Sequence, residues 1–274
     1  MRLIMKVTVL TNNIPFNTRL ESEHGLSLFV ETDAGKKILF DTGQTGIFYR
    51  NAVKLGIDIA EAEYIVFSHG HYDHIGGFRS LHKILENKKL VFNSSGFFNK
   101  TKKEIWSFKF IGIKEDEKNR IKGFNNKIDI KEGDFSADDF MVLGNIPFAS
   151  DREQVNRKFM IGKGNSSSQD YMNDEVVLCV IKPDGVIIIT GCSHRGLINI
   201  LHHIKQKLDS RIKAAIGGFH FIDKNQVYLE WIAGRLEKFD IETVMPLHCT
   251  GKKGINFLKN TFSGKIKQQT VLVL

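Results

Sequence analysis

Four side chains that can bind a metal ion lie within six consecutive residues of this 274-residue chain. They are His69, His71, Asp73 and His74. The run before them, residues 64–67, is apolar and ends at a glycine-containing turn, which is typical of a buried strand that leads into a loop. Imidazole and carboxylate groups are the usual ligands of a borderline divalent ion such as zinc, and a loop lets them converge. The pattern therefore predicts a metal site, in preference to a loop of solvated histidines.

One supersecondary unit recurs along the chain: an apolar strand, a glycine-containing loop with histidine, and an amphipathic helix. It occupies residues 64–86, 186–208, 212–238 and 241–261. The later loops carry His194, His220 and His248. If these strands end at one rim of a sheet, their histidines lie near the first histidine loop. Strand–helix alternation, with hairpins at 27–40 and 176–190, predicts a mixed sheet system covered by helices.

An acid follows the strand predicted at residues 37–40. Asp41 opens the sequence Asp41-Thr42-Gly43, and helical spacing runs from about residue 47 to 55. An acid at a strand end followed by glycine suits a functional loop, whereas an acid before a helix is also a common N-cap. Both interpretations of Asp41 are open at this point.

Residues 93–173 break the strand–helix rhythm. They are rich in Asn, Lys, Ser and Gly, with only short apolar pieces. We expect an insertion of strands and long loops that covers the site, within one domain spanning residues 1–274. The glycine- and serine-rich stretch at 162–168 lacks the spacing of a P-loop, so it predicts an ordinary loop.

The composition is ordinary for a globular protein, with 42% hydrophobic and 26% charged residues. The three cysteines are odd in number and far apart, which predicts reduced thiols and a cytoplasmic location. No apolar run approaches the length that crosses a bilayer, so no membrane partner is expected.

The formal net charge is +8, and residues 100–131 hold ten basic and five acidic side chains. This segment is either a solvated lysine-rich surface or a rim that attracts a small anionic substrate. No stacking-aromatic pattern or known motif supports nucleic acid as a partner.

The motif His69-x-His71-x-Asp73-His74 after a hydrophobic strand resembles the signature of the metallo-β-lactamase superfamily. Asp41, His194 and His248 match further motifs of that superfamily in the same order. The resemblance covers nearly the whole chain outside the middle segment, and it implies an α/β fold, a four-layer αββα sandwich, with a dinuclear metal site at one edge. It implies one metal on His69, His71 and His194 and a second on Asp73, His74 and His248. It also implies a hydrogen bond between Asp41 and a ligand histidine.

The resemblance further implies the chemistry. Two divalent ions, zinc in the first place with manganese or iron as alternatives, would hold a hydroxide that attacks the substrate, with Asp73, His220 and Asp41 as catalytic side chains. Di-iron relatives carry Glu where this chain has His71, which favours hydrolytic or transfer chemistry. His220 either contacts substrate phosphate or acts as an acid, or it is satisfied by backbone groups. His24 is a weaker candidate that braces the loop.

The sequence departs from the superfamily pattern at one strand end. The superfamily usually has Thr-Gly-Asp there, whose Asp bridges the metals, whereas this chain has Thr190-Gly191-Cys192. Cys192 is therefore either a thiolate ligand or a buried structural cysteine. The usual separate histidine motif upstream of this strand is absent, so its role falls to His194. His202 and His203 lie within a predicted helix, where we expect surface exposure.

Several short motifs resemble the dihydropterin-synthase-like branch, which includes an enzyme of methanopterin biosynthesis. They are Glu23-His24-Gly25-Leu26-Ser27, Asp174-Glu175, Gly191-Cys192-Ser193-His194-Arg195-Gly196, Gly217-Gly218-Phe219-His220 and His248-Cys249-Thr250-Gly251. The branch implies a hydrolase of a small phosphorylated or ester metabolite. The alternative is a transferase that joins hydroxymethyl-dihydropterin diphosphate to ribofuranosyl-aminobenzene phosphate. A nuclease, suggested by charge alone, is the third possibility.

Overall fold

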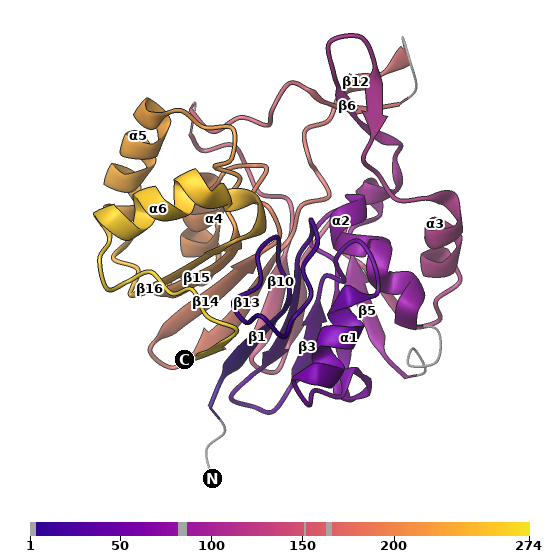
Figure 1. The fold of residues 1–274 in the computed structure, drawn as a ribbon, viewed down its shortest axis with the longest axis horizontal. Helices are drawn as coiled ribbons and strands as arrows, with labels where there is room; N and C mark the ends of the chain where they lie inside the picture. The colour runs from indigo at the N-terminus through magenta and orange to yellow at the C-terminus, as the bar shows by residue number, and fades with distance from the viewer. Residues whose placement is uncertain (1–3, 82–86, 151, 163–165) are drawn as a thin grey trace.

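The computed structural model describes residues 4–81, 87–150, 152–162 and 166–274 of the chain. Two β-sheets lie face to face, and helices cover the outer face of each sheet (Figure 1). The predicted four-layer αββα sandwich is therefore confirmed. No helix in the described part of the chain combines the length and the apolar character needed to span a membrane.

The first sheet has seven strands in the order β17-β1-β2-β3-β4-β5-β8. The hairpin predicted at 27–40 is present as the antiparallel pair β2–β3, and β3, β4, β5 and β8 run parallel. Because parallel strands end at the same edge, the loops after β3 and β4 lie side by side. The strands are β1 (Lys6–Thr11), β2 (Ser27–Glu31), β3 (Lys37–Phe40), β4 (Tyr64–Val66), β5 (Lys89–Phe92), β8 (Lys127–Asp129) and β17 (Val271–Val273).

The second sheet has six strands in the order β16-β15-β14-β13-β10-β9. The predicted hairpin at 176–190 is the antiparallel pair β13–β14, and β14, β15 and β16 run parallel. Three histidine-bearing loops therefore leave one edge of this sheet. The strands are β9 (Phe135–Ala137), β10 (Phe140–Leu143), β13 (Val177–Lys182), β14 (Gly185–Thr190), β15 (Ile212–Gly218) and β16 (Thr243–Leu247).

Alternation along the strands builds separate cores on the two faces of each sheet. In β14, Ile187 and Ile189 pack between the sheets, while Val186 and Ile188 pack under the helices. The first sheet is covered by α1 (Ile47–Lys54), α2 (Tyr72–Ile75) and α3 (Glu115–Lys122), the second by α4 (Leu197–Leu208), α5 (Gln226–Leu236) and α6 (Gly251–Thr261). Short 3-10 helices are η1 (Ile59–Glu61), η2 (Gly76–Leu81), η3 (Ser94–Phe97), η5 (Glu237–Phe239) and η6 (His248–Thr250).

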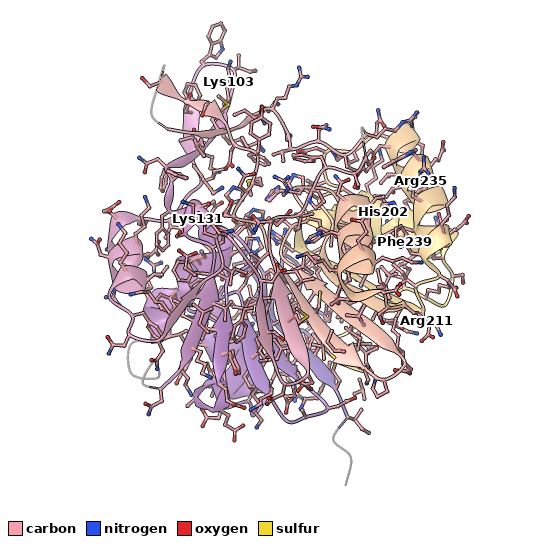
Figure 2. The ribbon with its side chains drawn as sticks, turned by 180° about the vertical axis from the view of Figure 1, so that it is seen from behind. Lys103, Lys131, His202, Arg211, Arg235 and Phe239 are labelled. Atoms are coloured by element: carbon pink, nitrogen blue, oxygen red, sulfur yellow. The ribbon has the colours of Figure 1, made fainter. Side chains whose placement is uncertain are left out.

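The middle segment, residues 93–173, contributes strands to the two large sheets and also forms a separate small sheet. Its strands β8, β9 and β10 belong to the two large sheets. The remaining strands form a small third sheet that projects from the body of the molecule (Figure 1), with Lys103 on it in the view from behind (Figure 2). The small sheet consists of β6 (Lys100–Lys103), β7 (Phe108–Phe110), β11 (Phe159–Ile161) and β12 (Ser168–Gln169).

The helix that ends the predicted unit at residues 64–86 differs in the structure. The histidine loop turns directly into α2, which continues as η2 up to Leu81, and the end of the predicted helix at 82–86 lies outside the described residues. Other backbone packs so closely against residues 76 and 77 in this turn that only glycine fits there. A Cβ on Gly77, for example, would lie 2.0 Å from the Thr42 carbonyl oxygen.

Lys100 ties the small sheet to the histidine loop. Its side chain is 1% exposed, and its Nζ lies 2.6 Å from Asp170 Oδ2 and 2.8 Å from Asp174 Oδ1. The other oxygen of Asp174 accepts a hydrogen bond of 2.6 Å from the Gly70 N–H, between two of the candidate ligand histidines. Assigning Lys100 to a solvated lysine-rich surface is therefore wrong, because two carboxylates compensate its burial.

We predict that Lys100→Ala lowers the free energy of unfolding by about 3–5 kcal/mol, because it leaves two buried carboxylates without their cation. Urea unfolding measures this loss. Lys102→Ala on the same strand removes a partly exposed lysine, and it should cost less than about 0.5 kcal/mol. Equal losses in the two variants would contradict the role of the buried ion group.

Candidate metal centre

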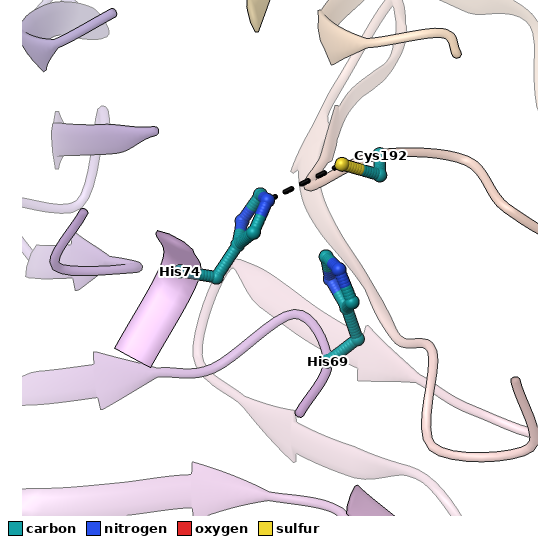
Figure 3. A group of neighbouring side chains, drawn as sticks. All are labelled: His69, His74 and Cys192. Atoms are coloured by element: carbon teal, nitrogen blue, oxygen red, sulfur yellow. Dashed lines mark hydrogen bonds between the residues drawn. The ribbon is translucent and has the colours of Figure 1, made fainter. Parts of the chain in front are cut away.

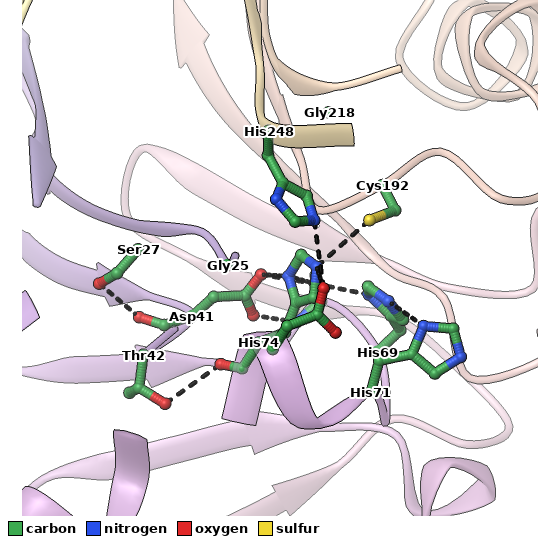
Figure 4. Close-up of polar contacts among 12 residues, drawn as sticks. Gly25, Ser27, Asp41, Thr42, His69, His71, His74, Cys192, Gly218 and His248 are labelled. Carbon is green, nitrogen blue, oxygen red and sulfur yellow. Dashed lines mark hydrogen bonds and ion pairs between the residues drawn. The ribbon is translucent and has the colours of Figure 1, made fainter. Parts of the chain in front are cut away.

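Four strand-end loops from the two sheets meet at one edge of the sandwich (Figure 4). The loop after β4 supplies His69 and His71, and α2, into which it turns, supplies Asp73 and His74. The loops after β14 and β15 supply Cys192, His194 and His220, and η6, directly after β16, supplies His248. All six residues expected to bind metal are brought together here, and apart from His24 and His220 the side chains of the cluster are buried.

The first group consists of His69, His71 and His194, whose candidate ligand atoms all lie within 4.8 Å of one another. His69 Nε2 is 3.0 Å from His71 Nδ1. Both ring nitrogens of His194, and Nε2 of His71, are buried without a hydrogen-bond partner in the described part of the chain. Buried polar atoms normally have partners, so nitrogens left in this way fit a bound cation.

The second group centres on the carboxylate of Asp73. Its Oδ2 lies 3.3 Å from His248 Nε2 and 3.9 Å from His74 Nε2. His24 Nε2 is nearer still, at 3.1 Å, and His24 forms a three-residue group with Asp73 and His248. The structure thus places His24 at the edge of the site, where it contacts the candidate ligand Asp73 directly.

Cys192 lies against the histidines of both groups (Figure 3). Its Sγ is 3.2 Å from His74 Nε2, and it shares a candidate ligand group with His69 and His74. Burial raises the pKa of the Cys192 thiol well above its usual value, so the chain alone keeps it protonated. A coordinated divalent ion deprotonates a thiol outright, and this position therefore fits a thiolate ligand between the two groups.

Asp41 holds His74 in place. Its Oδ2 is 2.6 Å from His74 Nδ1, while its two oxygens accept hydrogen bonds from the N–H and the Oγ–H of Ser68 at 2.8 Å and 2.6 Å (Figure 4). The N-cap interpretation of Asp41 is wrong, because α1 begins after Gly46, well beyond this carboxylate. The hydrogen bond fixes the ring so that Nε2 points at Asp73 and Cys192.

Other residues support the site through contacts that the sequence did not predict, although Asp174-Glu175 was recognised there as a short motif. Asn13 Oδ1 lies 2.6 Å from His248 Nδ1, and the neighbouring Asn12 accepts the His248 N–H at 2.8 Å. Glu175 accepts the N–H of His194 at 2.7 Å and that of Arg195 at 2.7 Å. These contacts join segments far apart in the chain, so local pattern does not reveal them.

Several site residues have strained backbone conformations. Asp41, Ser193, His220 and His248 all have φ between +47° and +57°. Non-glycine residues seldom adopt this left-handed region, and such strain persists where the surrounding structure imposes it. At each of these strand ends the strain turns a polar side chain toward the common edge.

The electrostatics of the site keep the imidazoles of the first group neutral but favour the protonated form of His74. Burial, assisted by the neighbouring histidines, lowers the pKa values of His69, His71 and His194 well below the usual imidazole range. For His74, burial acts in the same direction, but Asp41 and Asp73 outweigh it and raise its pKa to about 9. Neutral imidazole is the form that binds a metal, so the first group needs no proton removed.

His220 lies beside the first group, at the mouth of a pocket. Its ring centroid is 4.5 Å from that of His194, and neither ring nitrogen has a hydrogen-bonding nitrogen or oxygen partner among the described residues. The interpretation that backbone groups satisfy His220 is therefore wrong. The pocket has a volume of about 130 Å³ and is lined by His194, His220, Lys224 and Tyr228, among others.

The two helical histidines outside the site differ from each other. His202 is exposed, as expected, and its ring packs edge-to-face with Phe239 on the outer surface (Figure 2). His203 is buried, and its Nε2 lies 3.0 Å from the Gly144 carbonyl oxygen, so the expectation of exposure is wrong there.

The fold and the site together are those of an αββα protein with a candidate metal centre at one edge. The sequence profile of the metallo-beta-lactamase superfamily matches residues 22–147. The protein MJ0448 of Methanocaldococcus jannaschii is 32% identical over 254 residues, which cover 92% of this chain and 93% of that one. The chain therefore belongs to the metallo-beta-lactamase superfamily, whose fold implies divalent metal binding.

Two further relatives narrow the comparison. The 7,8-dihydropterin-6-methyl-4-(beta-D-ribofuranosyl)-aminobenzene-5'-phosphate synthase of M. jannaschii is 30% identical over 267 residues, 90% of this chain and 87% of that one. The crystal structure of Tm1679, a metal-dependent hydrolase of the beta-lactamase superfamily, has a TM-score of 0.83 at 32% identity and covers 98% of both chains. The predicted resemblance to the dihydropterin-synthase-like branch is confirmed by the first of these.

We predict that Asp41→Asn weakens metal binding by about 10–100-fold, because the substitution removes the carboxylate that orients His74. Competition with a coloured chelator measures the affinity. Asp184→Asn, which removes an exposed carboxylate paired with Lys213, should leave the affinity unchanged. Unchanged affinity in Asp41→Asn would show that the carboxylate does not act on the ligand.

We also predict that the cobalt-substituted protein shows a thiolate-to-cobalt charge-transfer band, and that Cys192→Ser abolishes it. Cys179→Ser is the matched control, because Cys179 is buried between the second sheet and its helices, away from the histidines. Persistence of the band in Cys192→Ser would exclude Cys192 as a ligand.

Proposed function

We propose that this protein is a metal-dependent hydrolase that acts on a small anionic metabolite carrying a phosphate or ester group. The observation that supports this most directly is the set of buried imidazole nitrogens without partners, which lie beside the carboxylate of Asp73 and the sulfur of Cys192. A structural role alone leaves no reason to bury so many unpaired polar atoms at one sheet edge.

In this proposal His69, His71 and His194 hold one divalent ion, and Asp73, His74 and His248 hold the second, with zinc as the first choice and manganese or iron as alternatives. When bound, such ions polarise a substrate oxygen and lower the pKa of coordinated water. Asp41 keeps the Nε2 atom of His74 directed at the ion. Cys192 supplies the ligand that the missing bridging carboxylate provides elsewhere in the superfamily.

The pocket beside His220 receives the leaving group. His220 faces it from the strand end after β15, where its imidazole is placed to donate a proton to the leaving group. Lys224, another lining residue, is half-buried with its Nζ 4.6 Å from the Tyr228 ring centroid, and it attracts an anionic group. Tyr228 donates a hydrogen bond of 3.1 Å to Glu153, which fixes that wall.

A transferase is the second candidate, and the 30% identity to the dihydropterin-conjugating synthase favours it. In that reaction an amine-bearing aromatic compound replaces water as the attacking group, and diphosphate leaves. Both candidates require anionic groups to be bound at the same edge. Neither requires nucleic acid or a membrane, and both agree with a cytoplasmic enzyme.

We predict that the zinc-loaded protein converts hydroxymethyl-dihydropterin diphosphate in one of two ways, distinguished by mass spectrometry in the presence of ribofuranosyl-aminobenzene phosphate. Formation of the conjugate would exclude the purely hydrolytic function, whereas loss of diphosphate alone would exclude the transferase. A panel of phosphate esters and diphosphates tests the broader hydrolase. Failure to turn over any of these compounds would contradict both candidates.

His71→Ala should abolish the activity, since it removes a proposed metal ligand, and metal analysis should fall from about two ions per chain. His202→Ala is the matched control, because it removes an exposed imidazole from α4 on the outer surface (Figure 2). Full activity and full metal occupancy in His71→Ala would contradict the proposed site.

A further inference from the structure

We propose that a groove beside α2 binds an aromatic ring that carries a phosphate group, as the distal end of the substrate. This inference rests on the proposed function, because it assigns a second anion site to the same substrate. The groove has a volume of about 320 Å³, at the lower end of the range of roughly 300–1,000 Å³ that small-molecule sites span. Its walls come from α2 and η2, from β7, and from the start of α3.

The groove carries an excess of positive charge. Arg79, Lys109 and Lys114 line it, and none of the three side chains forms an ion pair with a carboxylate in the described part of the chain. The one acid in the lining is Glu117, which accepts the Lys114 N–H at 3.0 Å at the start of α3. Burial raises the pKa of Glu117, although the nearby charges of Arg79 and Lys114 act to lower it. Three cations around one concave surface, with a single carboxylate among them, attract a compact anion such as phosphate.

Two aromatic rings line the same groove. Phe110 on β7 is 45% exposed, and the phenol of Tyr72 is partly exposed. An aromatic ligand that stacks on such a ring removes apolar surface from water and adds a geometric ring–ring attraction. A free phosphate would satisfy the cations but would leave both rings in water, so the combination fits a ring and a phosphate in one ligand.

Tyr72 joins the groove to the metal centre. It lies between His71 and Asp73 in the sequence, and its N–H donates a hydrogen bond of 3.1 Å to the carbonyl oxygen of Ile111, close to the lining residue Phe110. Its ring centroid is 6.5 Å from that of His24, whose Nε2 contacts Asp73. One side chain therefore forms the wall between the two sites, so a single extended substrate reaches from the groove to the metals.

Binding of phenylphosphonate and methylphosphonate to the zinc-loaded protein tests the inference by calorimetry. Both ligands carry the same anionic group, and neither is cleaved by hydrolysis of an ester. We expect phenylphosphonate to bind at least about threefold more tightly, because only it stacks on the rings. Lys109→Gln/Lys114→Gln should weaken both ligands at least about tenfold, and Phe110→Ala should remove the preference for the phenyl compound.

The matched control is Lys102→Gln/Lys103→Gln, which removes the same charge from the neighbouring strand β6, outside the groove. This variant should change either affinity by less than about twofold. The inference is overturned if the groove variant and the control variant weaken phosphonate binding equally. It is also overturned if neither variant weakens binding while His71→Ala abolishes it, because the phosphonate would then bind at the metals. These binding measurements do not depend on turnover. A protein that binds the phosphonates through the groove but turns over no substrate would therefore contradict only the proposed function.

Discussion

The buried carboxylate of Asp41 connects the ends of β3 and β4, and the rest of the site depends on this connection. It accepts hydrogen bonds from Ser68 and lies 2.6 Å from His74, so the histidine loop can leave its strand in only one direction. The carboxylate is fully buried, and these contacts compensate its desolvation. A rigid start to the loop is what allows four candidate ligands within six residues to face inward together.

The same arrangement recurs around the site: one ring nitrogen is bound to the protein, and the other points to the centre. His69 Nδ1 lies 2.9 Å from Ser68 Oγ, and His248 Nδ1 lies 2.6 Å from Asn13 Oδ1. Together with the contact between Asp41 and His74, these bonds select the ring orientation in which Nε2 is available. Orientation by a partner on the far nitrogen is the usual way in which proteins prepare histidine ligands.

The sequence predicted the parts of this structure that depend on local pattern. Strand periodicity, glycine-containing turns and helical spacing located the hairpins and the strand–loop–helix units, because each lies within a continuous stretch. The contacts of Lys100 and Glu175 were not predicted, because each of them pairs residues far apart in the chain. The middle segment was harder to predict from the sequence. Its short strands are defined by their pairing with other strands, as β8 is by its pairing with β5. Cys192 was singled out only because it departs from a known motif.

The candidate ligands are divided between the two halves of the sandwich. In the proposed assignment, each metal takes ligands from the histidine loop of the first sheet and at least one from the second sheet, His194 or His248. Each ion would thus add a link between two layers that are already joined by apolar packing and by polar contacts such as that between Lys182 and Asp33, and it would close a long loop of the chain. Unlike the ligands of a small zinc-binding motif, these come from strand ends of two different sheets. We therefore expect metal uptake to follow the folding and packing of both sheets.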